Sequence, residues 1–183
     1  MPSSLMDNPA ALRERASRIR LVAFDVDGTL TDGRLWFDAE GRDSKAFNAR
    51  DGLGLRMLED NGIAVAWITA RDSASARARA HDLRISHVFT GVHDKLACLR
   101  ELCASLGMGH EEVAYMGDDL NDLCLFAEVG LAACPADAHV EVLDRAHWRT
   151  AAKGGYGAAR ELCDLVLQAR GLDEIALSRY LHG

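Results

Sequence analysis

The stretch Leu21-Val-Ala-Phe-Asp-Val-Asp-Gly-Thr29 places four apolar residues directly before two aspartates and a glycine. A short, continuous apolar run is typical of a strand that is buried on both faces, as in a parallel sheet. In such a sheet ligands bind beyond the carboxyl ends of the strands, which is where Asp25 and Asp27 stand. The stretch therefore predicts an α/β fold with a ligand site after its first strand.

Working outward from this stretch, apolar runs alternate with helical patterns. The runs that we predict as strands are residues 21–26, 63–69, 88–90, 113–117 and 131–134. The amphipathic segments that we predict as helices are residues 52–61, 73–82, 94–106, 120–128 and 158–170. Repeated strand and helix units form a doubly wound parallel sheet, so the predicted fold is α/β and Rossmann-like.

Length and charge narrow the class of protein. The chain has 183 residues and a net charge of −7, and this length favours one domain over residues 1–183. Its basic residues are scattered, which argues against nucleic acid or an anionic membrane as a partner. No apolar run approaches the ~18 residues needed to cross a bilayer, and residues 1–20 lack the apolar stretch of a signal peptide. We therefore expect a cytoplasmic protein.

One segment, residues 33–49, breaks the alternation of strands and helices. Two possible arms, residues 34–38 and 44–48, flank a Glu40-Gly41 turn and predict a β-hairpin flap after the first strand. A lone hairpin is marginal in water, so its aromatic residues should pack against something. These residues are Trp36, Phe37 and Phe47. We expect packing against a neighbouring subunit; the alternative is that the hairpin folds onto its own domain.

Polar residues also follow the other predicted strands. They are Thr69 after the second, Lys95 after the third, and Asp118, Asp119 and Asp122 after the fourth. All should meet Asp25 and Asp27 at one rim of the sheet. Two carboxylates ~4 Å apart repel by about 4 kcal/mol at an effective dielectric near 20, so cations must lie between them. Oxygen ligands without a nearby His or Cys favour Mg²⁺, and Lys95 supplies a second positive charge.

The spacing of Asp25 and Asp27 predicts two distinct roles. In an extended strand end, residues two apart point the same way, so both side chains reach one phosphoryl group. Asp25 is predicted to attack phosphorus and form an acyl phosphate. Asp27 is predicted to protonate the leaving alkoxide and then to deprotonate the attacking water. The metal, the ammonium of Lys95, the hydroxyl of Thr69 and nearby backbone amides would cradle the phosphoryl oxygens.

Four segments resemble the motifs of the haloacid dehalogenase superfamily phosphatases in order and spacing. They are Asp25-Val-Asp-Gly-Thr-Leu-Thr-Asp-Gly33, Ile68-Thr69, Lys95 and Gly117-Asp-Asp-Leu-Asn-Asp122. The resemblance implies that Asp25 is the nucleophile and a metal ligand, and that Asp27 is the general acid and base and lends a backbone carbonyl to Mg²⁺. It further implies that Thr69 and Lys95 bind the phosphoryl group, that Asp118 ligates the metal and that Asp122 supports the cluster.

The segment between the first motif and the next helix is too short for the cap domain that this superfamily usually carries. Segments 47–56, 68–71 and 154–157 are similar to its capless tetrameric branch. The resemblance implies a homotetramer that hydrolyses a sugar-acid phosphate, 3-deoxy-D-manno-octulosonate 8-phosphate. The implied substrate site comprises Asp27, Asn48, Ala49, Arg50, Asp51, Gly52, Arg56, Arg71, Arg79 and Lys95. The alternative for each arginine is a solvated position on a helix.

The pattern departs from the branch at Tyr156, where we expect an arginine. The glycines around it either cover a neighbour's site or start the last long helix, ahead of a tail at about 171–183. Alternative substrates are a nine-carbon keto sugar-acid phosphate or a broad set of small metabolites. Alternatives from other classes are a phosphoaccepting receiver, which Asp27 disfavours because it should hasten hydrolysis, and a catalytically silent oligomerisation module.

Overall fold

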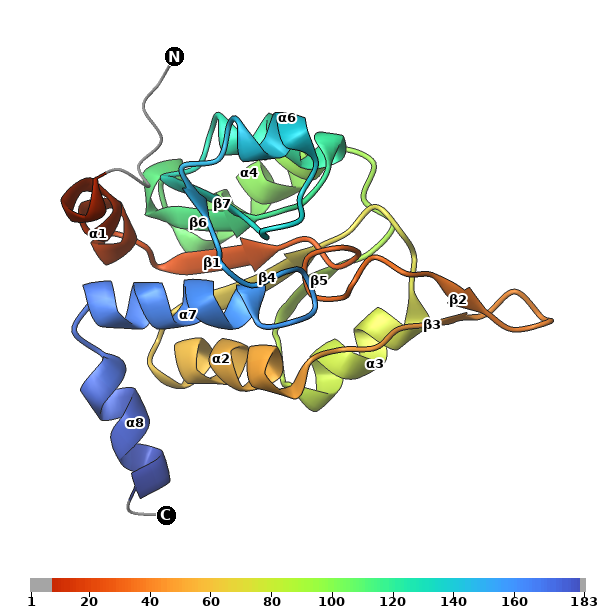
Figure 1. Ribbon diagram of the computed structural model, residues 1–183, viewed down its shortest axis with the longest axis horizontal. Coiled ribbons are helices and arrows are strands. Elements are labelled where there is room, and N and C mark those ends of the chain that lie inside the picture. The colour runs from red at the N-terminus through yellow and green to blue at the C-terminus, as the bar shows by residue number, and fades with distance from the viewer. Residues whose placement is uncertain (1–7, 182–183) are drawn as a thin grey trace.

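The computed structural model describes residues 8–181 and has a six-stranded parallel sheet with helices on both faces (Figure 1). The order across the sheet is β5-β4-β1-β6-β7-β8. The strands are β1 (Leu21–Phe24), β4 (Ala64–Ile68), β5 (His87–Phe89), β6 (Val113–Met116), β7 (Leu131–Cys134) and β8 (Trp148–Arg149). The predicted doubly wound α/β class is confirmed.

The strand order creates a switch point between β1 and β6. The chain runs outward from β1 through β4 to β5 and then returns to β6, on the other side of β1. In doubly wound sheets the crevice for ligands opens at this reversal, at the carboxyl ends of the strands. The register pairs Phe24 with Met116, so the residues that follow β1 and β6 begin side by side.

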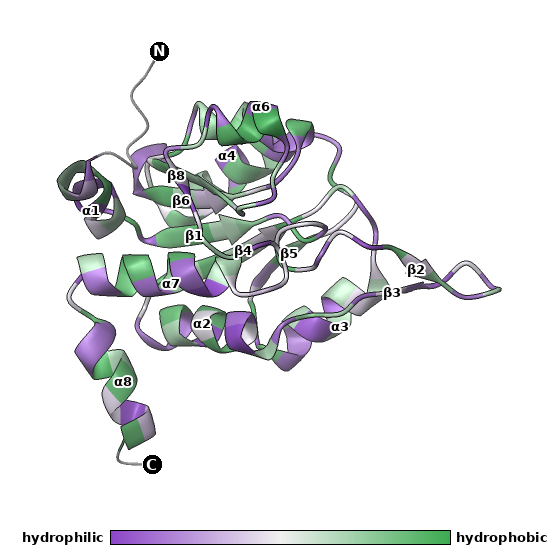
Figure 2. Ribbon diagram, viewed as in Figure 1, coloured by the Kyte–Doolittle hydropathy of each residue, from purple (hydrophilic) through white to green (hydrophobic). Residues whose placement is uncertain are grey.

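Helices cover the sheet in two layers, each with its own apolar core (Figures 1 and 2). One layer contains α1 (Pro9–Ser17), α2 (Ala49–Asp60), α3 (Ala74–Asp82) and α7 (Ala158–Ala169). The other contains α4 (Lys95–Leu106), α5 (Leu123–Phe126) and α6 (Val140–Leu143). The remaining helical elements are η2 (His110–Glu112), η3 (Leu120–Asp122) and α8 (Asp173–Leu181). None of the helices within residues 8–181 is long and apolar enough to span a membrane.

Polar caps begin three helices close to the carboxyl rim of the sheet. Asn48 caps α2, Ser73 caps α3 and Asp94 caps α4, each accepting a backbone N–H from the first turn. These caps satisfy donors that have no partner inside the helix. They also fix where Lys95, the first residue of α4, enters the rim.

The predictions for residues 1–20 and 171–183 extend to residues 1–7 and 182–183, which lie outside the described range.

The hairpin is present but its second arm differs from the prediction. β2 (Trp36–Phe37) pairs with β3 (Asp43–Ser44), whereas residues 45–48 lead into α2, so the predicted arm at 44–48 is wrong. The reason is a tight turn: Asp38 Oδ1 accepts the backbone N–H groups of Glu40 at 3.0 Å and Arg42 at 2.8 Å. These side-chain hydrogen bonds close the turn by residue 42, so the second strand begins at Asp43 and ends at Ser44.

The aromatic residues of the hairpin segment divide between two environments. Phe47 stacks on Trp67 in the core, with ring centroids 5.7 Å apart. Trp36 and Phe37 are 62% and 55% exposed on β2, which projects away from the sheet (Figure 1). Packing against its own domain therefore holds for Phe47, while Trp36 and Phe37 leave an apolar surface open to solvent.

Candidate active site

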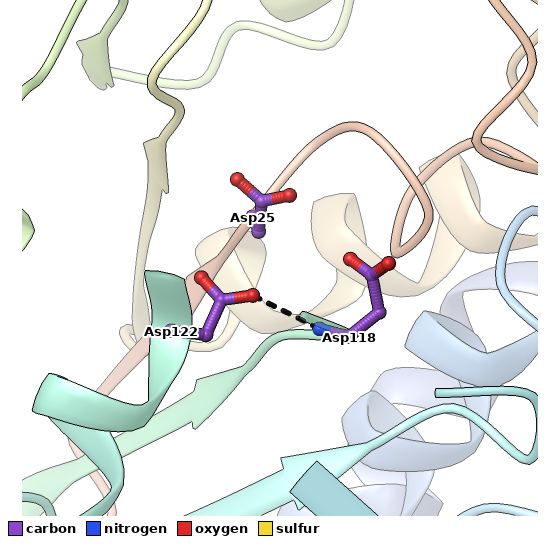
Figure 3. A group of neighbouring side chains, drawn as sticks. All are labelled: Asp25, Asp118 and Asp122. Carbon is purple, nitrogen blue, oxygen red and sulfur yellow. Dashed lines mark hydrogen bonds between the residues drawn. The ribbon is translucent and has the colours of Figure 1, made fainter. Parts of the chain in front are cut away.

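Three carboxylates meet at the switch point, where Figure 3 shows them on the same side of the strand ends. Asp25 follows β1, Asp118 follows β6 and Asp122 ends η3; each offers an oxygen within 4.8 Å of the others. Glycine makes this approach possible. A Cβ on Gly28 would lie 2.1 Å from Asp118 Oδ2, and one on Gly117 would lie 2.3 Å from Asp122 Cγ.

Asp122 is the fully buried anchor of this cluster. Its Oδ2 accepts the backbone N–H groups of Asp118 at 3.0 Å and Asp119 at 3.2 Å, which fixes the turn after β6. Its Oδ1 accepts the Tyr115 hydroxyl at 2.6 Å and the Lys95 ammonium at 2.6 Å. With these bonds Asp122 orients its neighbours and has few lone pairs left for a ligand.

Lys95 supplies the buried positive charge. Its Nζ donates to Asp25 Oδ1 at 2.7 Å and to Asp122 Oδ1 at 2.6 Å, and its side chain is 3% exposed. Burial alone would lower its pKa, but the two carboxylates outweigh burial and raise it above the ordinary value. Lys95 is therefore charged and joins the first motif to the last.

One ammonium does not neutralise the whole cluster. Burial, followed by repulsion from Asp122, raises the pKa of Asp25 to about 7 despite Lys95. Burial, followed by repulsion from Asp25 and Asp122, raises the pKa of Asp118 to about 8. Crowded carboxylate oxygens with too little positive charge beside them are the ligands that a hard divalent cation binds. Asp25 and Asp118 therefore fit Mg²⁺.

This charge imbalance predicts how stability depends on pH and metal. A carboxyl whose folded pKa lies above its unfolded value contributes stability at low pH and loses it as pH rises through the folded pKa. For Asp25 and Asp118 this loss falls between pH 3.8 and about 8. With a chelator present, the melting temperature should fall by about 5 °C or more from pH 5.5 to 8.5.

Mg²⁺ should reverse this fall, because it binds the charged carboxylates and only the folded state presents them together. Differential scanning fluorimetry at pH 5.5 and 8.5, with Mg²⁺ or chelator, measures both effects. A melting temperature that does not change with pH under chelator, or equal stabilisation by Mg²⁺ at both pH values, would contradict the prediction.

Asp27 lies beside the cluster with a different partner. Its Oδ1 accepts the ammonium of Lys45, and its Oδ2 lies 3.9 Å from Arg71 Nε. Lys45 also lies 3.4 Å from Asp43 Oδ2 and has a side chain that is 1% exposed. Lys45 was not predicted from the sequence. Its position two residues after Asp43 was the available signal, because residues at that spacing in a strand share a face.

Two threonines complete this rim. Thr69 follows β4 and is buried, and its Oγ1 accepts the backbone N–H of Arg71 at 3.4 Å. Thr29, which we did not predict as a site residue, donates its hydroxyl to Asp118 Oδ1 at 3.1 Å. Thr29 thus holds one oxygen of Asp118, and Thr69 directly follows β4, the strand next to β1.

The four predicted arginines take different positions. Arg71 reaches Asp27 and lies over the Phe37 ring, 5.7 Å from its centroid. Arg50 is exposed on the first turn of α2, beside the exposed Ala49. Arg56 donates instead to the Leu83 carbonyl and the Asp60 carboxylate, and Arg79 pairs with Asp82. Among residues 8–181, only Arg71 of these four forms an ion pair with a predicted catalytic residue.

A glycine-rich loop, residues 153–157, packs against the loop after β1. Gly155 donates its N–H to the Thr29 carbonyl at 3.1 Å, and a Cβ on Gly154 would lie 1.8 Å from the Gly28 carbonyl oxygen. Gly157, with a φ of 111°, is the N-cap of α7, so this segment starts the last long helix. Tyr156 is 62% exposed.

Two predicted substrate residues bind this loop. Asn48 donates Nδ2 to the Gly155 carbonyl at 3.2 Å. Asp51, which is buried, accepts the backbone N–H groups of Gly157 at 3.3 Å and Arg160 at 2.8 Å. Burial raises its pKa. Gly52 leaves room for the guanidinium of Arg79, since a Cβ there would lie 2.4 Å from Nη2.

Comparisons with known proteins agree with this geometry. A model of the haloacid dehalogenase-like hydrolases matches residues 87–162. The chain is 47% identical over 157 residues to the 3-deoxy-D-manno-octulosonate 8-phosphate phosphatase of Yersinia pestis. The aligned residues cover 86% of this chain and 84% of the relative.

Solved structures extend the similarity to the whole fold. A hypothetical protein from Xanthomonas campestris has a TM-score of 0.92 and 51% identity, with 98% of this chain and 99% of that chain covered. The 3-deoxy-D-manno-octulosonate 8-phosphate phosphatase of Moraxella catarrhalis, in complex with magnesium, phosphate and KDO, has a TM-score of 0.89 and 38% identity. That comparison covers 92% of this chain and 97% of the Moraxella chain.

Proposed function

Because this chain belongs to the haloacid dehalogenase-like hydrolases, among the 3-deoxy-D-manno-octulosonate 8-phosphate phosphatases, we propose that it hydrolyses that sugar-acid phosphate with the help of Mg²⁺. The observation that carries the proposal is the cluster of Asp25, Asp118 and Asp122, in which the buried ammonium of Lys95 pairs with Asp25 and Asp122. The cluster has the charge, the donor atoms and the position at the switch point that phosphoryl transfer requires.

Asp25 is the nucleophile in this proposal. Its carboxylate attacks phosphorus, the ester bond to the sugar oxygen breaks, and an acyl phosphate forms on Asp25. Lys95 holds Asp25 Oδ1 and adds positive charge beside the transferring group. Asp25, Asp118 and the main-chain carbonyl of Asp27 would hold Mg²⁺, which supplies charge neutralisation when bound.

Asp27 transfers the protons. It donates one to the leaving sugar oxygen, and afterwards it takes one from the water that hydrolyses the acyl phosphate. Its carboxylate is paired with Lys45, outside the group formed by Asp25, Asp118 and Asp122. That separation suits a proton carrier, because the carboxylate stays free of the metal.

The sugar acid also carries a carboxylate, which needs a cation apart from the phosphoryl site. Arg71 and Arg50 are our candidates, because both guanidinium groups are exposed and the first lies beside Asp27. A planar guanidinium binds a carboxylate through two parallel hydrogen bonds. In the proposed site Asn48 and Asp51 hold the glycine-rich loop in place, and Thr69 binds the phosphoryl group.

A phosphate-release assay tests the proposal. The panel contains 3-deoxy-D-manno-octulosonate 8-phosphate, a nine-carbon keto sugar-acid phosphate and glucose 6-phosphate, each with Mg²⁺ or with a chelator. The eight-carbon acid should give the highest kcat/KM, and the chelator should remove activity. A higher value for the nine-carbon acid, or equal values for all three, would favour the alternative substrates.

We also propose that the protein is a cytoplasmic homotetramer with one phosphatase domain per chain. The support is the exposed apolar surface of the hairpin, formed by Leu35, Trp36 and Phe37. Patches of this kind usually mark protein contacts. Multi-angle light scattering should give four times the chain mass for the wild type and a smaller mass for a Trp36→Ser, Phe37→Ser variant. A monomeric wild type would contradict this part of the proposal.

A further inference from the structure

Lys45 is a buried lysine that the proposed catalytic scheme does not use. It lies just after β3, and its ammonium pairs with Asp27 Oδ1 and lies 3.4 Å from Asp43 Oδ2. Its side chain is 1% exposed. A buried ammonium is costly unless carboxylates balance it. Here one carboxylate comes from the hairpin and the other from the loop that carries the nucleophile.

The hairpin carboxylate is itself anchored. Ser73, the buried N-cap of α3, donates its hydroxyl to Asp43 Oδ2 at 2.6 Å. A chain of contacts thus runs from α3 through Ser73, Asp43 and Lys45 to Asp27. These contacts tie Lys45 to the N-terminus of α3 as well as to the hairpin.

The two oxygens of Asp27 differ as a result. Oδ1 is held by Lys45, whereas Oδ2 is buried and has no hydrogen-bond partner in the part of the chain that the structure describes. A carboxylate is symmetric until one oxygen is fixed. The contact with Lys45 therefore leaves Oδ2 as the oxygen available to the proton.

We propose that Lys45 is a positioning residue that holds Asp27 so that Oδ2 faces the leaving oxygen of the sugar and, later, the attacking water. Lys45 itself transfers no proton. This inference rests on the proposed function, because it refines how Asp27 carries out proton transfer at that same site.

The first test is steady-state kinetics of Lys45→Met, which keeps an unbranched side chain as far as Cε and removes the ammonium. A misplacement of about 1 Å at a reacting group costs on the order of 100-fold in rate. On 3-deoxy-D-manno-octulosonate 8-phosphate with Mg²⁺, kcat should fall by about that factor while KM stays close to the wild-type value. Lys45→Arg, which keeps the charge, should recover part of kcat and serves as the second variant if Lys45→Met does not fold.

A second measurement separates positioning from loss of folded enzyme. p-Nitrophenolate leaves without a proton, so p-nitrophenyl phosphate should phosphorylate Asp25 normally in Lys45→Met, whereas hydrolysis of the acyl phosphate still needs Asp27. Rapid-mixing experiments should show a burst of about one p-nitrophenolate per active site followed by slow turnover. A partly unfolded preparation would instead reduce the burst and the turnover together.

The matched control is Arg42→Gln, a cation on the same hairpin that pairs with Asp38 and Glu40 at the exposed tip. It should keep the wild-type kcat. If the wild type is active, two results would overturn the role of Lys45: a Lys45→Met variant with the wild-type kcat, or a loss of kcat in Arg42→Gln as large as that in Lys45→Met. Either result would leave the proposed function standing. A wild type that releases no phosphate from either substrate would overturn both.

Discussion

Asp25→Asn should lower kcat for phosphate release by about 10⁴-fold or more, because an amide does not form the acyl phosphate. The variant should still fold. Asparagine has the shape of aspartate, and Lys95 keeps its contacts with Asp122 at 2.6 Å and with the Tyr115 hydroxyl at 3.3 Å. A phosphate-release assay with Mg²⁺ measures the loss, and retention of more than about a hundredth of the wild-type rate would contradict a nucleophilic Asp25.

The same variant should be more stable than the wild type when a chelator is present. Burial and Asp122 raise the pKa of Asp25 from 3.8 to about 7, so the wild type loses stability as pH rises through this window. Asparagine does not titrate. The melting temperature of Asp25→Asn should therefore exceed that of the wild type by an amount that grows up to about pH 7 and stays constant above it. Asp144→Asn, at the exposed C-cap of α6, is the control and should show no such difference.

A lower melting temperature for Asp25→Asn than for the wild type at pH 8.5 would contradict this expectation. It would mean that the contact between Asp25 and Lys95 outweighs the cost of burying the charge. An active-site group that lowers the stability of the fold is what we expect where chemistry, rather than stability, fixes the residue.

The strands of the sheet centre were predictable because each is a continuous apolar run. β1, β4, β6 and β7 appear within the predicted ranges because both of their faces are buried, and β5 overlaps its range. β8 was missed because Trp148 and Arg149 form a two-residue edge strand without an apolar run. The predicted helix at 120–128 is a 3-10 turn followed by the four-residue α5.

The candidate site was predictable where the backbone alone determines it. Parallel strands end at one rim, and because β1 pairs with β6, Asp25 and Asp118 approach each other whatever their rotamers. Tyr115 was missed because a strand buried on both faces is a continuous apolar run without alternation. No pattern in such a run marks the residue whose hydroxyl faces the cluster. The partner of Arg56 was equally hidden, because helical periodicity places a residue on a face without saying which carbonyl it contacts.

Lys95→Met should lower the free energy of unfolding, and by more than Lys45→Met does. Removing one partner of a buried ion pair typically costs about 3–5 kcal/mol, because it leaves an uncompensated charge. In this cluster it leaves the carboxylates of Asp25 and Asp122 facing each other without the ammonium between them. The melting temperature should fall by on the order of 10 °C, and kcat by about 10³-fold.

The control for stability is Lys153→Met, the same substitution at an exposed lysine, which should change the free energy of unfolding by no more than about 0.5 kcal/mol. The cause of the loss in Lys95→Met is tested by pH. If repulsion between carboxylates is responsible, stability should recover as the pH is lowered, because protonation removes the repulsion. A loss of the same size at pH 5 and pH 8.5 would instead indicate a packing defect.

A double variant, Lys95→Met with Asp122→Asn, distinguishes the two explanations without changing pH. It removes one of the two facing charges, so the melting temperature should rise above that of Lys95→Met while kcat stays low, because Asp25 still lacks its ammonium. If the second substitution lowered stability further, the hydrogen bonds that Asp122 accepts from Asp118 and Asp119 would outweigh its charge. The comparison therefore measures whether this cluster is held together chiefly by charge neutralisation.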